Sequence, residues 1–378
     1  MRDQFLLRPD RIHLNHGAFG ACHTTVFSAY QRHQLAVESD PNDYLLRTFA
    51  ARMAPVRKAL ADYVHADPND LVLLANTTTA MNLVARSLHL QPGDEILSSD
   101  QEYGAIDKVW EFICEQTGAR YVRQPLPMPA PSAEAIADAI WAGVTDKTRV
   151  LSISHIAAQT SLVLPVAELA ARARSRGIVS VIDGAHAPGQ IDLDLQAIGA
   201  DIYIGNCHKW LGAPRASALL YVRRDWHERL EPLVISWGWR PWQPGPSRLV
   251  DDHQWPGTFD VAARLAIVEA IDFAKQVLEP GRQRCHDLVV DFAREAHSGL
   301  GLCALGALAA TAQMVTLALP DCDAFALGRQ LLQDDGIDVA VNKWSGRPHL
   351  RVSVQVYNDF AELDRLLQSL HRILRPVR

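Results

Sequence analysis

The sequence lacks several patterns that would place it in a specialised class of protein. Its six cysteines are scattered, with no CxxC pair and no matching histidine spacing, so neither a zinc site nor a disulfide framework is indicated. Apolar runs such as LVLLA at 71–75 are far shorter than the roughly 20 residues of a membrane span. The N-terminal MRDQFLLRPD has no signal-peptide core. We therefore expect reduced thiols, no metal, no membrane segment and a cytoplasmic location.

A strong excess of one charge is also missing. The net charge is −6, and acidic and basic residues are interspersed without the basic stripe that a phosphate backbone requires. Nucleic acid is therefore not expected as a partner. What is present is ordinary globular composition, 48% hydrophobic and 21% charged, in a chain of 378 residues. That length suits one large domain and a smaller one.

Short apolar segments alternate with helical periods over the first part of the chain. This alternation predicts an α/β fold, with a mostly parallel sheet covered by helices on both faces. After Arg224 the pattern changes to a Trp- and Pro-rich stretch, followed by long helices at about 261–278 and 281–298 and a last strand-helix set. We place the start of a second domain near residue 262. The expected strands are 71–75, 95–99, 119–124, 149–154, 178–183 and 201–205, and the expected helices begin near 78 and 105 and span 132–144 and 166–177.

Four of the expected strands are followed by residues whose side chains could bind a ligand or take part in a reaction. Ligands of such sheets bind at the carboxyl ends of the strands. There the sequence places NTTTAMN after 71–75, Tyr103 after 95–99, Asp183 after 178–182, and Lys209 in NCHKW after 201–205. Each has an ordinary structural explanation when taken singly: a helix cap, a packed ring, a turn residue or a surface amine.

Taken together, these residues match the needs of one cofactor. A helix start rich in hydroxyls suits a phosphate, a tyrosine ring offers a stacking surface, a carboxylate holds a protonated ring nitrogen, and an amine forms an imine. This combination predicts pyridoxal phosphate (PLP). The protonated ring is an electron sink for charge at a substrate α-carbon, and the lysine both anchors the cofactor and moves protons.

The ordered motifs NTTTAMN, DQEYGA, VIDGAHAPGQIDLDLQAIGAD, GNCHKWLGAP and LRVSVQVYND resemble the class V aminotransferase family of PLP-dependent fold type I enzymes. LNHGAFG at 14–20 and DYLLR at 43–47 resemble the isopenicillin N epimerase branch of that family. The resemblance implies a large PLP-binding domain with its N-terminal segment at 1–261 and a small C-terminal α+β domain at 262–378. It also implies an amino-acid substrate and a homodimer with shared active sites.

Site residues follow from the same resemblance, position by position. Lys209 would bind the cofactor covalently, Asp183 would pair with the ring nitrogen, and Arg351 would take the substrate carboxylate. Tyr103 would stack on the ring, where cysteine desulfurases carry a histidine. The remaining cofactor contacts would be Thr78, Thr79, Asn206 and His208 around the phosphate, Ala185 beneath the ring, His186 near the 3′-oxygen, and Gly257 and Thr258 lent by the neighbouring subunit. Asn15 and His16 complete the expected substrate-binding set, and His16 or Tyr103 is a candidate second acid.

Two departures from the family pattern bear on the reaction. Ala158 stands where a polar residue is usual, followed by Gln159, and the segment DDGIDVAVNKWSGRPH contains no cysteine where desulfurases carry their nucleophile. Epimerisation or racemisation at the α-carbon is our main expectation. Elimination from a cysteine-like substrate and transamination use the same residues and stay open. A non-catalytic cofactor-binding protein is the contrasting hypothesis, which the presence of Lys209, Asp183 and Arg351 disfavours.

Overall fold

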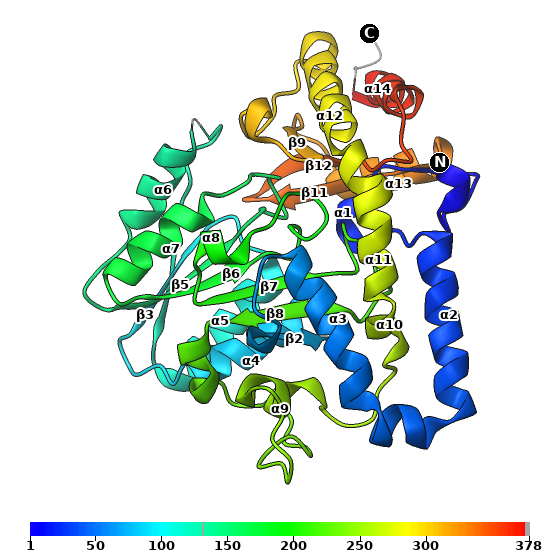
Figure 1. Cartoon of the computed structure of the whole chain (residues 1–378). Helices are drawn as coiled ribbons and strands as arrows, with labels where there is room; N and C mark the ends of the chain where they lie inside the picture. Colours follow the sequence, from blue (N-terminus) through cyan, green and yellow to red (C-terminus); the bar gives the residue numbers. More distant parts are fainter. Residues whose placement is uncertain (131, 375–378) are drawn as a thin grey trace.

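The computed structural model describes residues 1–130 and 132–374, and a seven-stranded sheet lies at its centre (Figure 1). The strand order is β2-β8-β7-β6-β5-β3-β4. Neighbours from β7 to β4 are parallel, and β8 is antiparallel to both β2 and β7. The predicted mostly parallel sheet is confirmed, although the apolar segment that forms β8 was not among the expected strands. The strands are β2 (Leu71–Leu74), β3 (Glu95–Ser99), β4 (Arg120–Gln124), β5 (Thr148–Ser154), β6 (Val179–Asp183), β7 (Ile202–Asn206) and β8 (Ala218–Val222).

Both faces of this sheet are buried, because successive side chains of a strand point to opposite sides. Leu71 and Leu73 of β2 join one apolar cluster, and Val72 and Leu74 join a second on the other face. Helices α4, α5 and α9 contribute to the second cluster, and α3, α6, α7 and α8 to the first. These helices are α3 (Phe49–Tyr63), α4 (Thr77–Ser87), α5 (Gly104–Thr117), α6 (Ala133–Trp141), α7 (Val166–Ser175), α8 (Leu195–Ile198) and α9 (Arg248–Gln254).

The two long helices expected after residue 261 form one nearly continuous helical run (Figure 1). Pro280 does not separate them, because it falls in the first turn of α12, where a missing N–H is tolerated. The first part packs against α2 (Thr24–Ser39) and α3, whereas α12 packs on β9 and α14. The run consists of α10 (Ala262–Leu265), α11 (Ile267–Phe273), a π-helical turn (Ala274–Leu278) and α12 (Glu279–Leu300).

A second, antiparallel sheet lies at one end of the molecule, in the order β11-β12-β9. The N-terminal segment joins this region, because β1 (Ile12–His13) pairs in parallel with β10 (Ile337–Asp338) and leads into α1 (His16–Phe19). The domain boundary near residue 262 stays a prediction. The other elements here are β9 (Met314–Ala318), α13 (Ala324–Asp334), β11 (Ala340–Trp344), β12 (Arg347–Ser353) and α14 (Phe360–Leu374).

Within residues 1–130 and 132–374, no helix combines the length and apolar character needed to cross a bilayer. The same residues contain no group of three or more histidine, cysteine or acidic side chains arranged as a metal site. All six cysteines are free thiols.

Candidate active site

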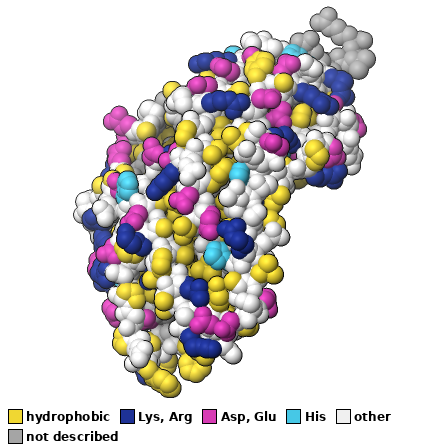
Figure 2. Space-filling view, turned by 45° about the vertical axis from the view of Figure 1, so that its right-hand side comes forward, with side chains coloured by type: hydrophobic (Ala, Val, Ile, Leu, Met, Phe, Trp, Pro, Cys, Tyr) yellow, Lys and Arg dark blue, Asp and Glu magenta, His cyan; other side chains and the backbone are white. Residues whose placement is uncertain are grey.

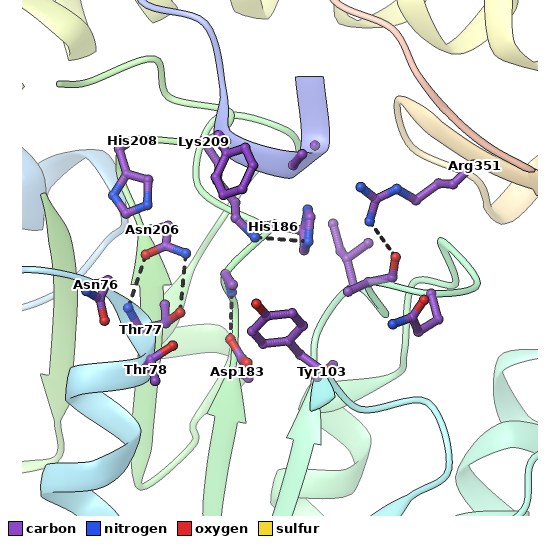
Figure 3. A pocket seen from close by; sticks show the side chains of 18 of the residues that line it. Asn76, Thr77, Thr78, Tyr103, Asp183, His186, Asn206, His208, Lys209 and Arg351 are labelled. Atoms are coloured by element: carbon purple, nitrogen blue, oxygen red, sulfur yellow. Dashed lines mark hydrogen bonds between the residues drawn. The ribbon is translucent and has the colours of Figure 1, made fainter. Parts of the chain in front are cut away.

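A cavity of about 510 Å³ lies where the carboxyl ends of the central strands face α1 and the second sheet (Figure 3). It collects residues from the N-terminal segment, the central sheet and β12. Nine of the predicted site residues line it: Thr78, Tyr103, Asp183, Ala185, His186, Asn206, His208, Lys209 and Arg351. The other lining residues are Gly17, Ala18, Phe19, Asn76, Thr77, Ser154, Ile156, Ala158, Gln159 and Asn342.

Lys209 enters the cavity from the loop after β7. Its Nζ lies 3.2 Å from Nε2 of His186. Burial lowers the pKa of Lys209 to about 8, and the charge of Arg351 acts in the same direction, while Asp183 opposes the shift. The ammonium form therefore still predominates at neutral pH, and the uncharged amine, which attacks a carbonyl and accepts protons, becomes the main form only above about pH 8.

Asp183 is the last residue of β6, and its carboxylate lies beside this lysine loop. Oδ1 accepts a hydrogen bond of 2.9 Å from the Ala185 N–H, which fixes the side chain across the turn. Among the described residues, no donor is bonded to Oδ2. Burial raises the pKa of Asp183, opposed by the Ala185 N–H and by Lys209. The free oxygen gives the cavity one buried acceptor for a cationic N–H group.

The start of α4 supplies the polar end of the cavity. Asn76 caps the helix by accepting from the Thr79 N–H at 2.8 Å, and the Thr77 N–H donates to Oδ1 of Asn206 at 3.1 Å. No protein acceptor for the Thr78 N–H occurs in the part of the chain that the structure describes. On the far side, Nδ1 of His208 bonds the Ser217 carbonyl at 2.8 Å. This leaves a helix N-terminus with an unpaired donor, which suits an anion.

Tyr103 lies at the N-cap of α5 and is 49% exposed, with its ring at the cavity (Figure 3). The preceding Glu102 is buried and ties two strand ends together. It accepts 2.6 Å hydrogen bonds from the hydroxyls of Ser99 and Ser154, and a 2.8 Å bond from the Ser154 N–H. Burial raises the pKa of Glu102 to about 7. The residue next to Tyr103 is thus a buried acid that our sequence analysis did not identify.

Arg351 reaches the cavity from β12. Its Nη1 donates to the Ala158 carbonyl at 2.6 Å and its Nη2 to Oδ1 of Asn15 at 3.5 Å, while the buried Nε has no partner. Burial lowers the pKa of Arg351 to about 10, which leaves it cationic at neutral pH. At position 158 the contact with Arg351 is therefore made by the backbone carbonyl, which any residue type can provide.

Five predicted residues do not line this cavity. Thr79 directs its hydroxyl to the Asn76 cap at 3.1 Å. His16 packs behind Trp210, with ring centroids 4.8 Å apart, and its Nδ1 lies 3.0 Å from the Tyr357 hydroxyl. Burial lowers its pKa to about 3, so this ring is neutral and removed from the substrate space. The remaining three are Asn15, which lines a smaller adjoining cavity, and Gly257 and Thr258, which lie elsewhere on the chain.

Several lining residues escaped the sequence analysis. Gly17, Ala18 and Phe19 belong to the LNHGAFG segment, whose relation to the site depends on contacts far along the chain. Asn342 comes from β11, and Thr77 and Asn76 were visible only as part of a helix-cap pattern. A usable signal did exist for the last two, because a cap at the end of a buried strand places its backbone donors at the ligand edge of the sheet.

Comparison with known proteins agrees with this geometry. The aminotransferase class-V family model matches residues 26–366. Isopenicillin N epimerase of Streptomyces clavuligerus is 36% identical over 390 residues, which cover 98% of this chain and 96% of that protein. Putative L-cysteine desulfhydrase 1 of Oryza sativa subsp. japonica is 29% identical over 404 residues, covering 96% of this chain and 83% of that protein.

A solved structure shares the fold. A lysine-to-alanine variant of C-DES, with glycine covalently linked to its PLP cofactor, has a TM-score of 0.82 and 22% identity, and covers 98% of this chain and 99% of the other. Family and fold agree with the prediction made from the strand-end residues. The chain therefore belongs to the aminotransferase class-V family and is a PLP-dependent enzyme of fold type I.

Proposed function

We propose that this enzyme binds an α-amino acid through Arg351 and moves the proton of its α-carbon, with epimerisation as the outcome. The observation that carries the proposal is the guanidinium of Arg351, whose buried Nε has no partner and which lines the same cavity as Lys209. A buried donor left unpaired is costly, and a substrate carboxylate would satisfy it.

The donor set of the cavity fits PLP. The unpaired Thr78 N–H at the start of α4, with Asn206 and His208 nearby, would hold the phosphate group. Asp183 would hold the ring nitrogen through its free oxygen, and Lys209 would carry the aldehyde. Tyr103 and Ala185 would contact the ring. When bound, PLP supplies an electron sink that stabilises negative charge at the substrate α-carbon.

The proton transfers belong to groups of this chain. Lys209, whose pKa burial lowers to about 8, would remove the α-proton or return it. Epimerisation requires that a proton also reach the α-carbon from the other direction. Tyr103 is our candidate for this second transfer, because it reaches the cavity from a different element than Lys209 does (Figure 3). His16 is no longer suited to that role, since it lies behind Trp210.

Epimerisation is favoured over sulfur chemistry by two observations. Identity to the epimerase, at 36%, exceeds that to the desulfhydrase, at 29%. None of the six cysteines, all within the described residues, lines the cavity, so no enzyme thiol is placed to accept sulfur from a substrate. Elimination from a cysteine-like substrate needs no such thiol. The similarity to desulfhydrases over 96% of the chain makes C–S lyase activity the second candidate.

One experiment separates the candidates. The PLP-loaded enzyme is incubated in deuterated water with a panel of L- and D-amino acids that includes thioether and disulfide derivatives. Epimerisation predicts deuterium at the α-carbon and the opposite enantiomer with no loss of amino acid. Elimination predicts pyruvate and ammonia, and transamination predicts a keto acid. Lys209→Ala is the matched control, and pyruvate formation without epimer would contradict the proposal.

We also propose that two copies share their active sites. Thr258 is exposed, and neither it nor Gly257 lines the cavity of its own chain, as expected of residues that serve a neighbour. Large apolar side chains are exposed as well, with Trp242 96%, Trp237 81% and Leu46 78% accessible. Figure 2 shows apolar side chains gathered through the middle and lower end of one face. Exposed apolar patches of this kind mark contact surfaces.

A further inference from the structure

His186 lies between two nitrogen-bearing side chains that follow one another in the sequence. Nε1 of Trp210 donates to Nδ1 of His186 at 3.2 Å, and Nζ of Lys209 lies 3.2 Å from Nε2 of the same ring. All three come from the lysine loop and the DGAH turn. Trp210 is fully buried and His186 is 3% exposed, so water does not compete for the Trp210–His186 bond.

The chemistry of these groups fixes where the protons are. An indole N–H is only a donor, so Nδ1 of His186 must offer a lone pair to Trp210. A neutral imidazole then carries its single proton on Nε2. That N–H points at Nζ of Lys209, which can accept it only as an uncharged amine, the form that predominates above about pH 8. The alternative tautomer would set the Nδ1–H of His186 against the N–H of Trp210.

The packing around Trp210 holds the indole in this position. Its ring lies against His16, and an added Cβ at Gly17 would touch the indole at 3.4 Å and would require Sδ of Met314, 2.7 Å away, to move. His16 is in turn held by the Tyr357 hydroxyl at 3.0 Å. Trp210 itself does not line the cavity. It can affect the site only through a residue that does.

We propose that Trp210 is a positioning residue that fixes His186 as the Nε2–H tautomer, so that His186 presents a hydrogen-bond donor to Lys209 and to the cavity. His186 then cannot act as the base that removes an α-proton. Instead, the Nε2–H of His186 donates a hydrogen bond to a negatively charged atom or a lone pair that faces it. The part of this inference that concerns Lys209 rests on the proposed function, whereas the tautomer does not.

Several charged groups near His186 and Lys209 affect the pKa values of these two side chains. Lys209 faces Asp183, which favours the charged amine, and Arg351, which disfavours it. His186 faces Lys209, Arg351 and His16, and burial with these neighbours lowers its pKa well below the usual value. The imidazole therefore stays neutral at neutral pH, and the position of its one proton is set by Trp210.

The tautomer is measured first, on the cofactor-free wild-type enzyme labelled with ¹⁵N-histidine. Long-range ¹H–¹⁵N correlation spectra distinguish a protonated Nε2 from a protonated Nδ1, and His186→Gln assigns the resonance by its absence. We expect Nε2 protonated and Nδ1 unprotonated at a pH above about 8, where Lys209 is mostly uncharged and can accept from Nε2. A protonated Nδ1, whether in the neutral ring or in a cation, would overturn the proposal without any activity being measured.

The effect on Lys209 is measured second, as the rate at which cofactor-free enzyme combines with PLP across a pH series. Trp210→Phe keeps the ring and removes the donor. His186 can then take the other tautomer and accept from a charged Lys209, so the midpoint should rise by about one pH unit. His186→Gln should shift the midpoint less than Trp210→Phe does, because its oxygen can accept from Trp210 and its amide can donate to Lys209.

A double variant shows whether Trp210 acts through His186. In a His186→Leu background, Trp210→Phe should cause no further shift of the midpoint. An equal shift in both backgrounds would mean that Trp210 matters only for packing and would refute the proposal, as would an unchanged midpoint in Trp210→Phe alone. Circular dichroism checks that each variant is folded. If Trp210→Phe does not fold, the tautomer of His186 measured in the wild-type enzyme decides whether the proposal holds. If wild-type His186 is the Nε2–H tautomer but the wild-type enzyme has no epimerase activity, the result counts against the proposed function and not against the tautomer.

Discussion

Replacing Arg351 by lysine is expected to weaken the binding of α-amino acids and to leave cofactor binding intact. Nη1 of Arg351 is bonded to the Ala158 carbonyl at 2.6 Å, and the buried Nε has no partner. The edge formed by Nε and Nη2 makes only the 3.5 Å contact from Nη2 to Oδ1 of Asn15, so it is the edge that we expect to meet both oxygens of a carboxylate. Lysine keeps a positive charge, but its single ammonium group cannot hold Ala158 and both carboxylate oxygens with the same geometry.

The magnitude follows from the hydrogen bond that is lost. A hydrogen bond to a charged group contributes about 1.5–3 kcal/mol. Its loss corresponds to a roughly 10- to 150-fold larger dissociation constant for the amino acid. Two parallel bonds become one, so a single such increment is the expected loss.

The assay is a spectral titration of the PLP-loaded enzyme with an amino acid and, separately, with the amine that lacks its carboxylate. Only the amino acid should lose affinity in Arg351→Lys. Arg329→Lys is the matched control, because Arg329 is exposed and lines only the smaller adjoining cavity. Equal weakening for the amino acid and the amine, or no weakening at all, would refute the assignment of Arg351 to the carboxylate.

Four further predictions address the rest of the site. Lys209→Ala should lose the yellow colour of the bound cofactor and all activity, and borohydride reduction followed by mass spectrometry should locate the cofactor on Lys209 in the wild type and on no other lysine. Asp183→Asn should keep the cofactor and lose on the order of a thousandfold in rate, because an amide cannot hold a charged ring nitrogen; near-normal turnover would make Asp183 a turn residue. Glu102 has a pKa that burial raises from 4.5 to about 7, so the folded state binds the extra proton in this window and stability falls as pH rises through it. Urea unfolding of Glu102→Gln should therefore depend less on pH between about 5 and 8, and an unaltered slope would contradict this assignment. Mixing inactive Lys209→Ala and Thr258→Arg chains should restore activity if sites are shared, since one site of each heterodimer then carries neither change, whereas verified, folded heterodimers without activity would argue against it.

The sequence was most informative where function lies directly at a strand end. Tyr103, Asp183 and Lys209 each follow an apolar segment of the parallel sheet, and such ends meet at one edge whatever the rest of the chain does. The fold class could be predicted for the same reason. Strand β8 was missed because our strand prediction relied on the alternation of strands and helices. This antiparallel strand between β2 and β7 is not part of such an alternating pair.

Other parts of the site depend on distant contacts that no local pattern encodes. Phe19 and Asn342 reach the cavity from opposite ends of the chain, and the role of Ala158 lies in its carbonyl. Trp210 is adjacent to Lys209 in sequence, yet its significance appears only when the distance to His186 is known. Side chains at strand ends could thus be placed in the cavity from the sequence, whereas the groups packed behind them required the three-dimensional structure.

The short N-terminal segment over Lys209 is held in place by residues from the far end of the chain. The Leu14 N–H donates to the Asp338 carbonyl and the Ser353 N–H to the Leu14 carbonyl, both at 2.8 Å. Gly20, at φ +69°, fits against the lysine loop, where an added Cβ would lie 2.3 Å from the His208 carbonyl. This cover is therefore anchored by β12, which the ribosome makes long after Lys209. The segment that covers Lys209 is therefore in place only after residues near the other end of the chain have folded, although Lys209 itself lies in the middle of the sequence.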